Sequence, residues 1–267
     1  LHHLVGSRSL VWNLAKNDIK KKFAGSYFGV VWAFVQPVIT VLLYWFVFEK
    51  GLNSKATDLR TGIEIPFVLW LTAGLVPWFY FQEALNGGTG VLVEYSYLVK
   101  KVVFQIDMLP VVKMISALFT HLFFVAFTMV LFICMGYMPD WYALQVIYYS
   151  FCMILFATGL VYATSAVTVF FRDMKEVVGI LLQIGMWVTP IMWNFETMVQ
   201  IPGWAITVLK LNPMYYIVSG YRNALINHIG FWEDMGLTVY FWVVTAVILF
   251  LGTTVFKRLR PHFADVL

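Results

Sequence analysis

The segment EYSYLVKKVVF, residues 94–104, is short, basic and aromatic, and long apolar runs lie before and after it. A segment of this kind between two apolar runs is expected at a membrane surface. Lys100 and Lys101 indicate the cytoplasmic surface, because short loops rich in lysine and arginine stay on that side. We therefore expect a cytoplasmic partner to contact residues 95–101.

The composition is that of a membrane protein. Of the 267 residues, 61% are hydrophobic and 12% are charged, whereas soluble domains have about 25% charged residues. The chain therefore reads as a single transmembrane domain covering residues 1–267. Its two cysteines, Cys134 and Cys152, lie inside apolar runs and have neither a metal-site spacing nor a disulfide framework. We interpret them as packing residues.

Six apolar runs approach or exceed the roughly 20 residues that a helix needs to cross a bilayer. These runs cover residues 30–48, 66–81, 109–135, 142–171, 177–193 and 237–256. The predicted fold class is all-α, a polytopic membrane protein with six transmembrane helices. Glycines at 87, 88 and 90 are expected to break the helical pattern after the second run.

Residues 8–24 are expected to form an amphipathic helix that lies on the membrane surface. Val11, Trp12 and Ala15 share one side of a helical wheel, and Lys16 and Lys20 share the other. This arrangement is typical of an interfacial helix with its basic face toward headgroups or a partner. A solvated basic leader is the alternative.

The distribution of basic residues predicts the orientation. Most of the 18 lysines and arginines fall in the leader, in residues 94–113, in the turn after the fourth run and in the tail after the sixth. By the positive-inside rule these segments are cytoplasmic. We therefore expect a multi-pass plasma-membrane protein with both termini in the cytoplasm, as an even number of spans requires.

Residues 194–234 do not fit a simple extracellular loop. The runs 204–211 and 214–226 are apolar, are too short to cross, and are split by Asn212 and Pro213. We expect a re-entrant helical hairpin that dips into the membrane from the outer face, where protein covers its backbone. An amphipathic lid flat on the outer leaflet is the alternative.

Residues for catalysis or metal binding are not apparent. The glycines at 87–90 are not followed by the lysine of a phosphate-binding loop. No acidic or histidine cluster and no nucleophile motif falls in the apolar runs. His121 stands alone in the third run, so ion-driven transport is disfavoured. We expect no catalytic residue, no metal and no cofactor in this chain.

Short motifs are spread over almost the whole chain. They are Tyr27-x-Gly29-x-x-Trp32, QP (36–37), YWFVF (44–48), IPFVLW (65–70), AGLVPWF (73–79), RD (172–173), LKLNP (209–213) with Tyr216, GYRN (220–223) and FW (241–242). Together they resemble the permease subunits of type-2 ABC exporters for polysaccharides. YWFVF and IPFV look most similar to the wall teichoic acid translocation permeases.

The resemblance implies a homodimer of permeases in the lipid bilayer, with two copies of an ABC ATPase that carry ATP and magnesium. The substrate would be a polymer on polyprenyl diphosphate, foremost wall teichoic acid, with O-antigen or capsule as the alternative, and no nucleic acid is implied. The residues expected to contact the ATPase are Tyr95, Tyr97, Leu98, Lys100, Lys101, Lys16 and Lys20. Arg172 and Asp173 would lie at the cytoplasmic entrance. The outer gate would comprise Asn212, Pro213, Tyr216 and Arg222.

Two other classes of function remain open from the sequence. A membrane transferase acting on a polyprenyl-linked substrate would need acids or histidines facing that substrate, and none are clustered. A channel or scaffold is the third reading. We expect a transport subunit that is not itself an enzyme.

Overall fold

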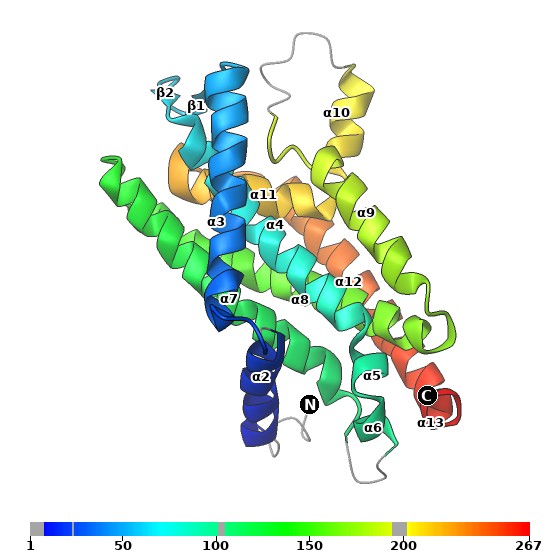
Figure 1. Ribbon diagram of the computed structural model, residues 1–267. Helices are drawn as coiled ribbons and strands as arrows, with labels where there is room; N and C mark the ends of the chain where they lie inside the picture. The colour runs from blue at the N-terminus through cyan, green and yellow to red at the C-terminus, as the bar shows by residue number, and fades with distance from the viewer. Residues whose placement is uncertain (1–7, 23, 101–104, 194–201) are drawn as a thin grey trace.

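The computed structural model describes residues 8–22, 24–100, 105–193 and 202–267, and this part of the chain is almost entirely helical (Figure 1). The helices are α2 (Arg8–Lys22), α3 (Trp32–Trp45), α4 (Phe67–Thr89), α5 (Val91–Glu94), α6 (Ser96–Val99), α7 (Met108–Cys134), α8 (Gln145–Phe170), α9 (Met174–Val188), α10 (Gly203–Lys210), α11 (Pro213–Arg222), α12 (Met235–Leu259) and α13 (Phe263–Val266). Two short strands, β1 (Ala56–Thr57) and β2 (Glu64–Ile65), pair antiparallel.

Within the described residues, four helical segments are long and apolar enough to cross a membrane. They are Trp32–Gly51, Met108–Cys134, Trp141–Phe170 and Met235–Val266. Two of the six predicted spans fall outside this set. Helix α4 is long enough but carries Gln82, Glu83 and Asn86 in its second half. Helix α9 has 15 residues and would measure about 22 Å. The count of six therefore stays a prediction.

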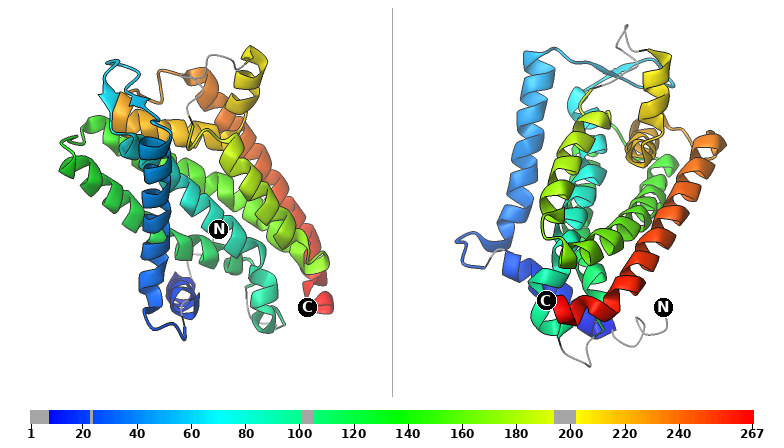
Figure 2. Two further views of the ribbon diagram at one scale, coloured as in Figure 1. Left: turned by 45° about the horizontal axis from the view of Figure 1, so that its top comes forward. Right: turned by 90° about the vertical axis from the view of Figure 1, so that its right-hand side faces the viewer.

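Helix α4 lies at the centre of the bundle. Its first half is buried without interruption from Leu69 to Trp78. Helices α3, α7, α8, α9 and α11 all pack against it. Helix α3 lies at the edge of the bundle (Figure 2), and only 6% of the most apolar stretch of Trp32–Gly51 is buried. An apolar helix this bare within one chain is covered by lipid or by another protein surface.

The two ends of the bundle differ in charge and structure. Helices α2, α5, α6 and α13 gather at one end, and the β1–β2 hairpin and α10 lie at the other (Figures 1 and 2). We call these the basic end and the hairpin end. The leader lysines, Lys100 and the basic tail all belong to elements of the basic end, as the positive-inside argument requires of residues on one side. Which side of the membrane this is remains a prediction.

The helix boundaries differ from the expected ones around glycine and proline. Helix α4 continues through Gly87 and Gly88 to Thr89, so the expected break comes only at Gly90. The reason is packing, because Gly88 lies directly against Val161 of α8 and a larger residue would not fit there. Helix α9 ends at Val188, just before Thr189 and Pro190, because proline cannot continue the hydrogen-bonded ladder.

Two short helices occupy the region expected to form the re-entrant hairpin. Helices α10 and α11 flank Asn212, whose side-chain oxygen accepts a hydrogen bond from the Met214 N–H at 3.0 Å and caps α11. Pro213 is the first residue of α11, where a missing N–H costs nothing. Residues 194–201 of the predicted outer region lie outside the described residues. The re-entrant placement in the membrane stays a prediction.

Helices α8 and α12 cross closely, and two glycines permit the close approach. A Cβ built on Gly252 would lie 2.9 Å from the carbonyl carbon of Gly159, and a Cβ built on Gly159 would lie 2.8 Å from the Leu249 nitrogen. Small residues let helix backbones approach closely in membranes, where lipid provides no hydrophobic driving force between helices. The crossing therefore depends on the absence of side chains at both positions.

Gly252→Ala is expected to destabilise the protein by about 1–3 kcal/mol, since the added methyl group must push α8 and α12 apart. Gly236→Ala is the matched control in the same helix, because a Cβ there meets only the Asp234 carboxylate at 3.7 Å. Thermal unfolding of the purified protein in detergent measures both. Equal melting temperatures for the two variants would contradict the close crossing.

Candidate functional site

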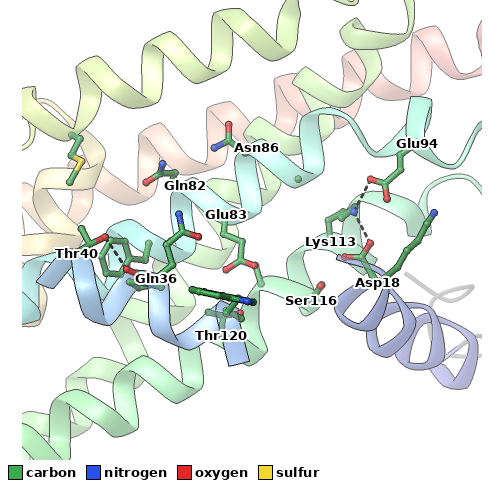
Figure 3. Close-up of a pocket in the computed structure, with 18 of the residues that line it drawn as sticks. Asp18, Gln36, Thr40, Gln82, Glu83, Asn86, Glu94, Lys113, Ser116 and Thr120 are labelled. Atoms are coloured by element: carbon green, nitrogen blue, oxygen red, sulfur yellow. Dashed lines mark hydrogen bonds and ion pairs between the residues drawn. The ribbon is translucent and has the colours of Figure 1, made fainter. Parts of the chain in front are cut away.

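A cavity of about 850 Å³ lies between α3, α4 and α7 and reaches the end of α2 (Figure 3). We call it the polar groove. Apolar residues such as Pro37 and Phe79 line part of it, and amide and hydroxyl side chains from three helices line the rest. They are Gln36 and Thr40 on α3, Gln82 and Asn86 on α4, and Ser116 and Thr120 on α7. Glu83 lines the groove beside Gln82.

The spacing on α4 creates this polar face. Gln82, Glu83 and Asn86 are one and four residues apart, so they share one side of the helix, while Ala84 and Leu85 on the other side are buried. The side chains of Gln82 and Asn86 are exposed. Polar side chains in a membrane-embedded helix are costly when they face lipid and are found where they face protein or a water-filled cavity. The groove is therefore a place for water or a polar guest.

A buried ion network closes the basic end of the groove. The Lys113 ammonium lies 2.6 Å from Asp18 Oδ1 and 2.8 Å from Glu94 Oε2 (Figure 3). The Tyr95 hydroxyl donates to the same Asp18 oxygen at 2.9 Å. The side chains of Asp18 and Lys113 are only 6% and 12% exposed. The network thus joins α2, the α5–α6 segment and α7 through charges that water screens poorly.

Tyr95 is part of the protein interior. Burial, followed by its hydrogen bond to Asp18, raises the pKa of the Tyr95 phenol well above its usual range. The hydroxyl therefore keeps its proton and remains a donor. Lys113 lies over its ring, 5.6 Å from the centroid. Tyr95 is better described as a joint between elements than as an outward-facing anchor.

The other residues predicted to contact an ATPase face outward. Tyr97 is 55% exposed, and Lys100, Lys16 and Lys20 are exposed. Leu98 is half-buried, and Lys101 lies outside the described residues. The structure therefore separates Tyr95, which packs inward, from Tyr97, which the sequence grouped with it.

The α5–α6 segment rests on an apolar cluster at the basic end. Val91, Leu92 and Val99 of this segment are buried together with Phe256 of α12 and Phe263 of α13. The segment contacts several elements far apart in the sequence. A force on Tyr97 would therefore reach α7, α8 and α12 through packed side chains.

The predicted entrance residues lie in the exposed turn between α8 and α9. Arg172 and Asp173 are both exposed. Two residues later, the Lys175 side chain covers Gly90 at the junction of α4 and α5. The turn and the α5–α6 segment, 80 residues apart in the sequence, thus meet at the basic end.

The residues predicted for an outer gate are structural contacts between helices, away from the polar groove. Arg222 is 6% exposed and donates to the carbonyl oxygens of Pro190 and Ile191 at 2.6 Å each. Asn212 donates to the Thr189 hydroxyl at 2.8 Å. The Tyr216 hydroxyl lies 3.0 Å from that of Tyr148 and points into the bundle. A gating role for these residues stays a prediction.

Sequence reasoning missed the ion network and the polar face of α4. Asp18 is the single acid in a basic leader, and Lys113 is a lone cation near the start of an apolar run. Each is a detectable signal, but only the fold shows that they pair. Gln82, Glu83 and Asn86 end a run that otherwise reads as apolar, and their helical spacing could have identified one polar face.

The family model described as ABC-2 type transporter matches residues 9–226, most of the chain. The chain therefore belongs to the ABC-2 type transporter family. Permeases of this family work with ATP-binding ABC subunits. The family predicted from the sequence motifs is confirmed at this level.

Known relatives align over nearly the full length. The O-antigen export system permease protein RfbA of Myxococcus xanthus is 25% identical over 258 residues, which cover 97% of this chain and 95% of that protein. A permease of the same name from Klebsiella pneumoniae is 21% identical over 258 residues, covering 95% of this chain and 93% of that protein. The predicted likeness to the wall teichoic acid branch is not confirmed by these relatives.

The buried ion network can be tested with a double-mutant cycle of Asp18→Asn and Lys113→Met. Lys113→Met alone is expected to cost about 3 kcal/mol of unfolding free energy, because it leaves a buried carboxylate without its cation. The double variant should recover part of that loss. Equilibrium unfolding in mixed micelles gives the coupling energy, expected at about 2 kcal/mol.

Lys55 and Glu64 form the matched control pair. They lie at the same 2.6 Å distance, but their side chains are 60% and 64% exposed. The cycle of Lys55→Met and Glu64→Gln should give a coupling energy below about 1 kcal/mol. A network coupling no larger than that of this pair would contradict the structural role of Lys113.

Proposed function

We propose that this chain is the membrane subunit of an ATP-driven exporter that moves a polyprenyl-diphosphate-linked polysaccharide from the cytoplasmic to the outer face of the plasma membrane. The observation that carries the proposal is the polar groove in a chain of the ABC-2 type transporter family. A row of amides and hydroxyls along three helices suits a hydrated polymer.

The relatives bear on the choice of polymer. Those reported above are O-antigen export permeases that align over 93% or more of their length. They favour an O-antigen-type glycan over wall teichoic acid, the polymer first expected from the sequence. Wall teichoic acid remains the alternative, because relatives at 21–25% identity can differ in substrate.

The basic end is the proposed docking surface for the ATPase. The exposed Tyr97 and Lys100 of the α5–α6 segment and the exposed Lys16 and Lys20 on α2 all lie on elements of this end. The ion network would hold these two elements in register while the partner pushes on either one. ATP-driven closure of two such partners would then shift the helices between two discrete arrangements.

A second copy of the chain would complete the path. Helix α3 exposes Ile39, Leu42 and Leu43, the exposed Phe46 follows directly after it, and one face of the groove is formed by that helix. A homodimer that buries the bare apolar surface of α3 would enclose the groove between two protomers. Both termini would be cytoplasmic, on the side where α2 and α13 lie at the basic end.

Export is tested with the permease and its ATPase reconstituted in proteoliposomes. Polyprenyl-diphosphate-linked glycans are expected to stimulate ATP hydrolysis and to appear on the opposite face, where an added glycosidase can cleave them. The same vesicles without ATP are the control. Protection of all glycan from the glycosidase, with an assembled and active ATPase, would contradict the proposal.

Tyr97→Ala is expected to weaken ATPase binding by about 2 kcal/mol, roughly 30-fold, because exposed aromatics are the usual anchors of such contacts. Tyr95→Phe is the matched control, since it removes only the hydroxyl that bonds Asp18 and leaves the exposed surface unchanged. Co-purification and titration in detergent measure both. If Tyr97→Ala binds the ATPase as tightly as the unchanged protein, Tyr97 is not the anchor and the main contact would lie on α2.

A further inference from the structure

The middle of the polar groove offers hydrogen bonds without positive charge. Gln36, Gln82 and Asn86 are exposed amides, and Thr40 and Thr120 add hydroxyls. Amides and hydroxyls both donate and accept hydrogen bonds. Sugar hydroxyls do the same, so a neutral glycan can exchange its water for these groups at little cost.

Carboxylates outnumber ammonium groups among the charged side chains that line the described groove. They are the carboxylates of Asp18, Glu83 and Glu94 and the ammonium groups of Lys21 and Lys113. Lys113 is held between two of these carboxylates at 2.6 and 2.8 Å. Lys21 sits at the basic end, 5.2 Å from the centroid of the Tyr95 ring. Arginine is absent from the described lining.

We infer that the groove admits an uncharged, hydroxyl-rich glycan and discriminates against a polymer with a phosphodiester in each repeat. The inference rests on the proposed function and narrows its substrate class. Phosphates are bound by charge-assisted donors, above all arginine forks, and the middle of the groove presents carboxylate and amide instead. A phosphate brought against a carboxylate is a like-charge contact, and such contacts select against the wrong partner.

The diphosphate of the lipid carrier does not conflict with this selectivity. Exposed Lys16, Lys20, Lys100 and Arg172 belong to the basic end and offer cations to the diphosphate before it enters. The diphosphate passes the groove once with each polymer, whereas a phosphodiester polymer would bring a charge past the amides of α3 and α4 at every repeat. The charge of the repeat unit, rather than that of the anchor, therefore decides which polymer passes.

The test compares two polymers of equal length on the same polyprenyl diphosphate: an uncharged hexose polymer and poly(glycerol phosphate). With permease and ATPase in proteoliposomes, the uncharged polymer is expected to stimulate ATP hydrolysis at least about tenfold more, the effect of a like-charge contact. Equal stimulation, or a preference for poly(glycerol phosphate), would overturn the inference and leave the proposed export function standing. Stimulation by neither polymer would contradict the proposed function itself.

Two variants assign the discrimination to the groove. Glu83→Gln is isosteric and removes one negative charge, so it should lower the stimulation ratio of uncharged to phosphate polymer. Gln82→Lys adds a cation at an exposed position and should lower the ratio further. If Glu83→Gln fails to assemble, Gln82→Lys alone tests the inference. Glu64→Gln, the same isosteric charge change at an exposed site of the hairpin end, should leave the ratio unchanged. A ratio insensitive to both groove variants would overturn the inference.

Discussion

The buried guanidinium of Arg222 is the interaction on which the hairpin end depends. Helix α9 ends before Pro190, and the carbonyl groups of Pro190 and Ile191 are left without helical partners. Arg222 donates to both at 2.6 Å, donates to the Trp70 carbonyl at 3.3 Å and stacks on the Trp70 ring at 3.3 Å from its centroid. Pro190 and Ile191 are buried, so leaving one of these carbonyl groups unsatisfied would cost about 1–3 kcal/mol. One side chain thereby ties α4, the end of α9 and α11 together.

This arrangement explains why Gly74 lies opposite Arg222. A Cβ on Gly74 would meet the guanidinium nitrogen Nη2 at 2.6 Å, so only glycine leaves room for it. Asn212 adds a second link to the same broken helix end through Thr189. The GYRN and LKLNP motifs therefore contain Arg222 and Asn212, which hydrogen-bond to the residues that follow the end of α9. Their resemblance to family motifs has a structural cause in this chain, independent of any gating role.

The sequence predicted the helices well and the partnerships poorly, for a physical reason. An apolar run and its length are local properties, so the segments that became α7, α8 and α12 could be recognised directly. Asp18 and Lys113 are 95 residues apart, and Tyr95 faces inward while Tyr97 faces outward, because the fold beyond this segment decides which side is covered. The helix break predicted at Gly88 was wrong for the same reason. Gly88 packs against Val161 of α8 within a continuous helix, and only the fold shows that contact.

Helix α4 is a single helix that connects the two ends of the molecule. Trp70 near its start is held by Arg222, and Gly90 after its end is covered by Lys175 and leads into the α5–α6 segment. Its polar face lines the groove between these two points. Helix α4 is continuous over 23 residues but contains Pro77, and an interior proline removes a backbone hydrogen bond and lets a helix bend. A push at the basic end would therefore act on the half of α4 beyond Pro77, which carries the polar face, and move it against α3, which has few contacts within the chain. This is the motion that would change the width of the groove.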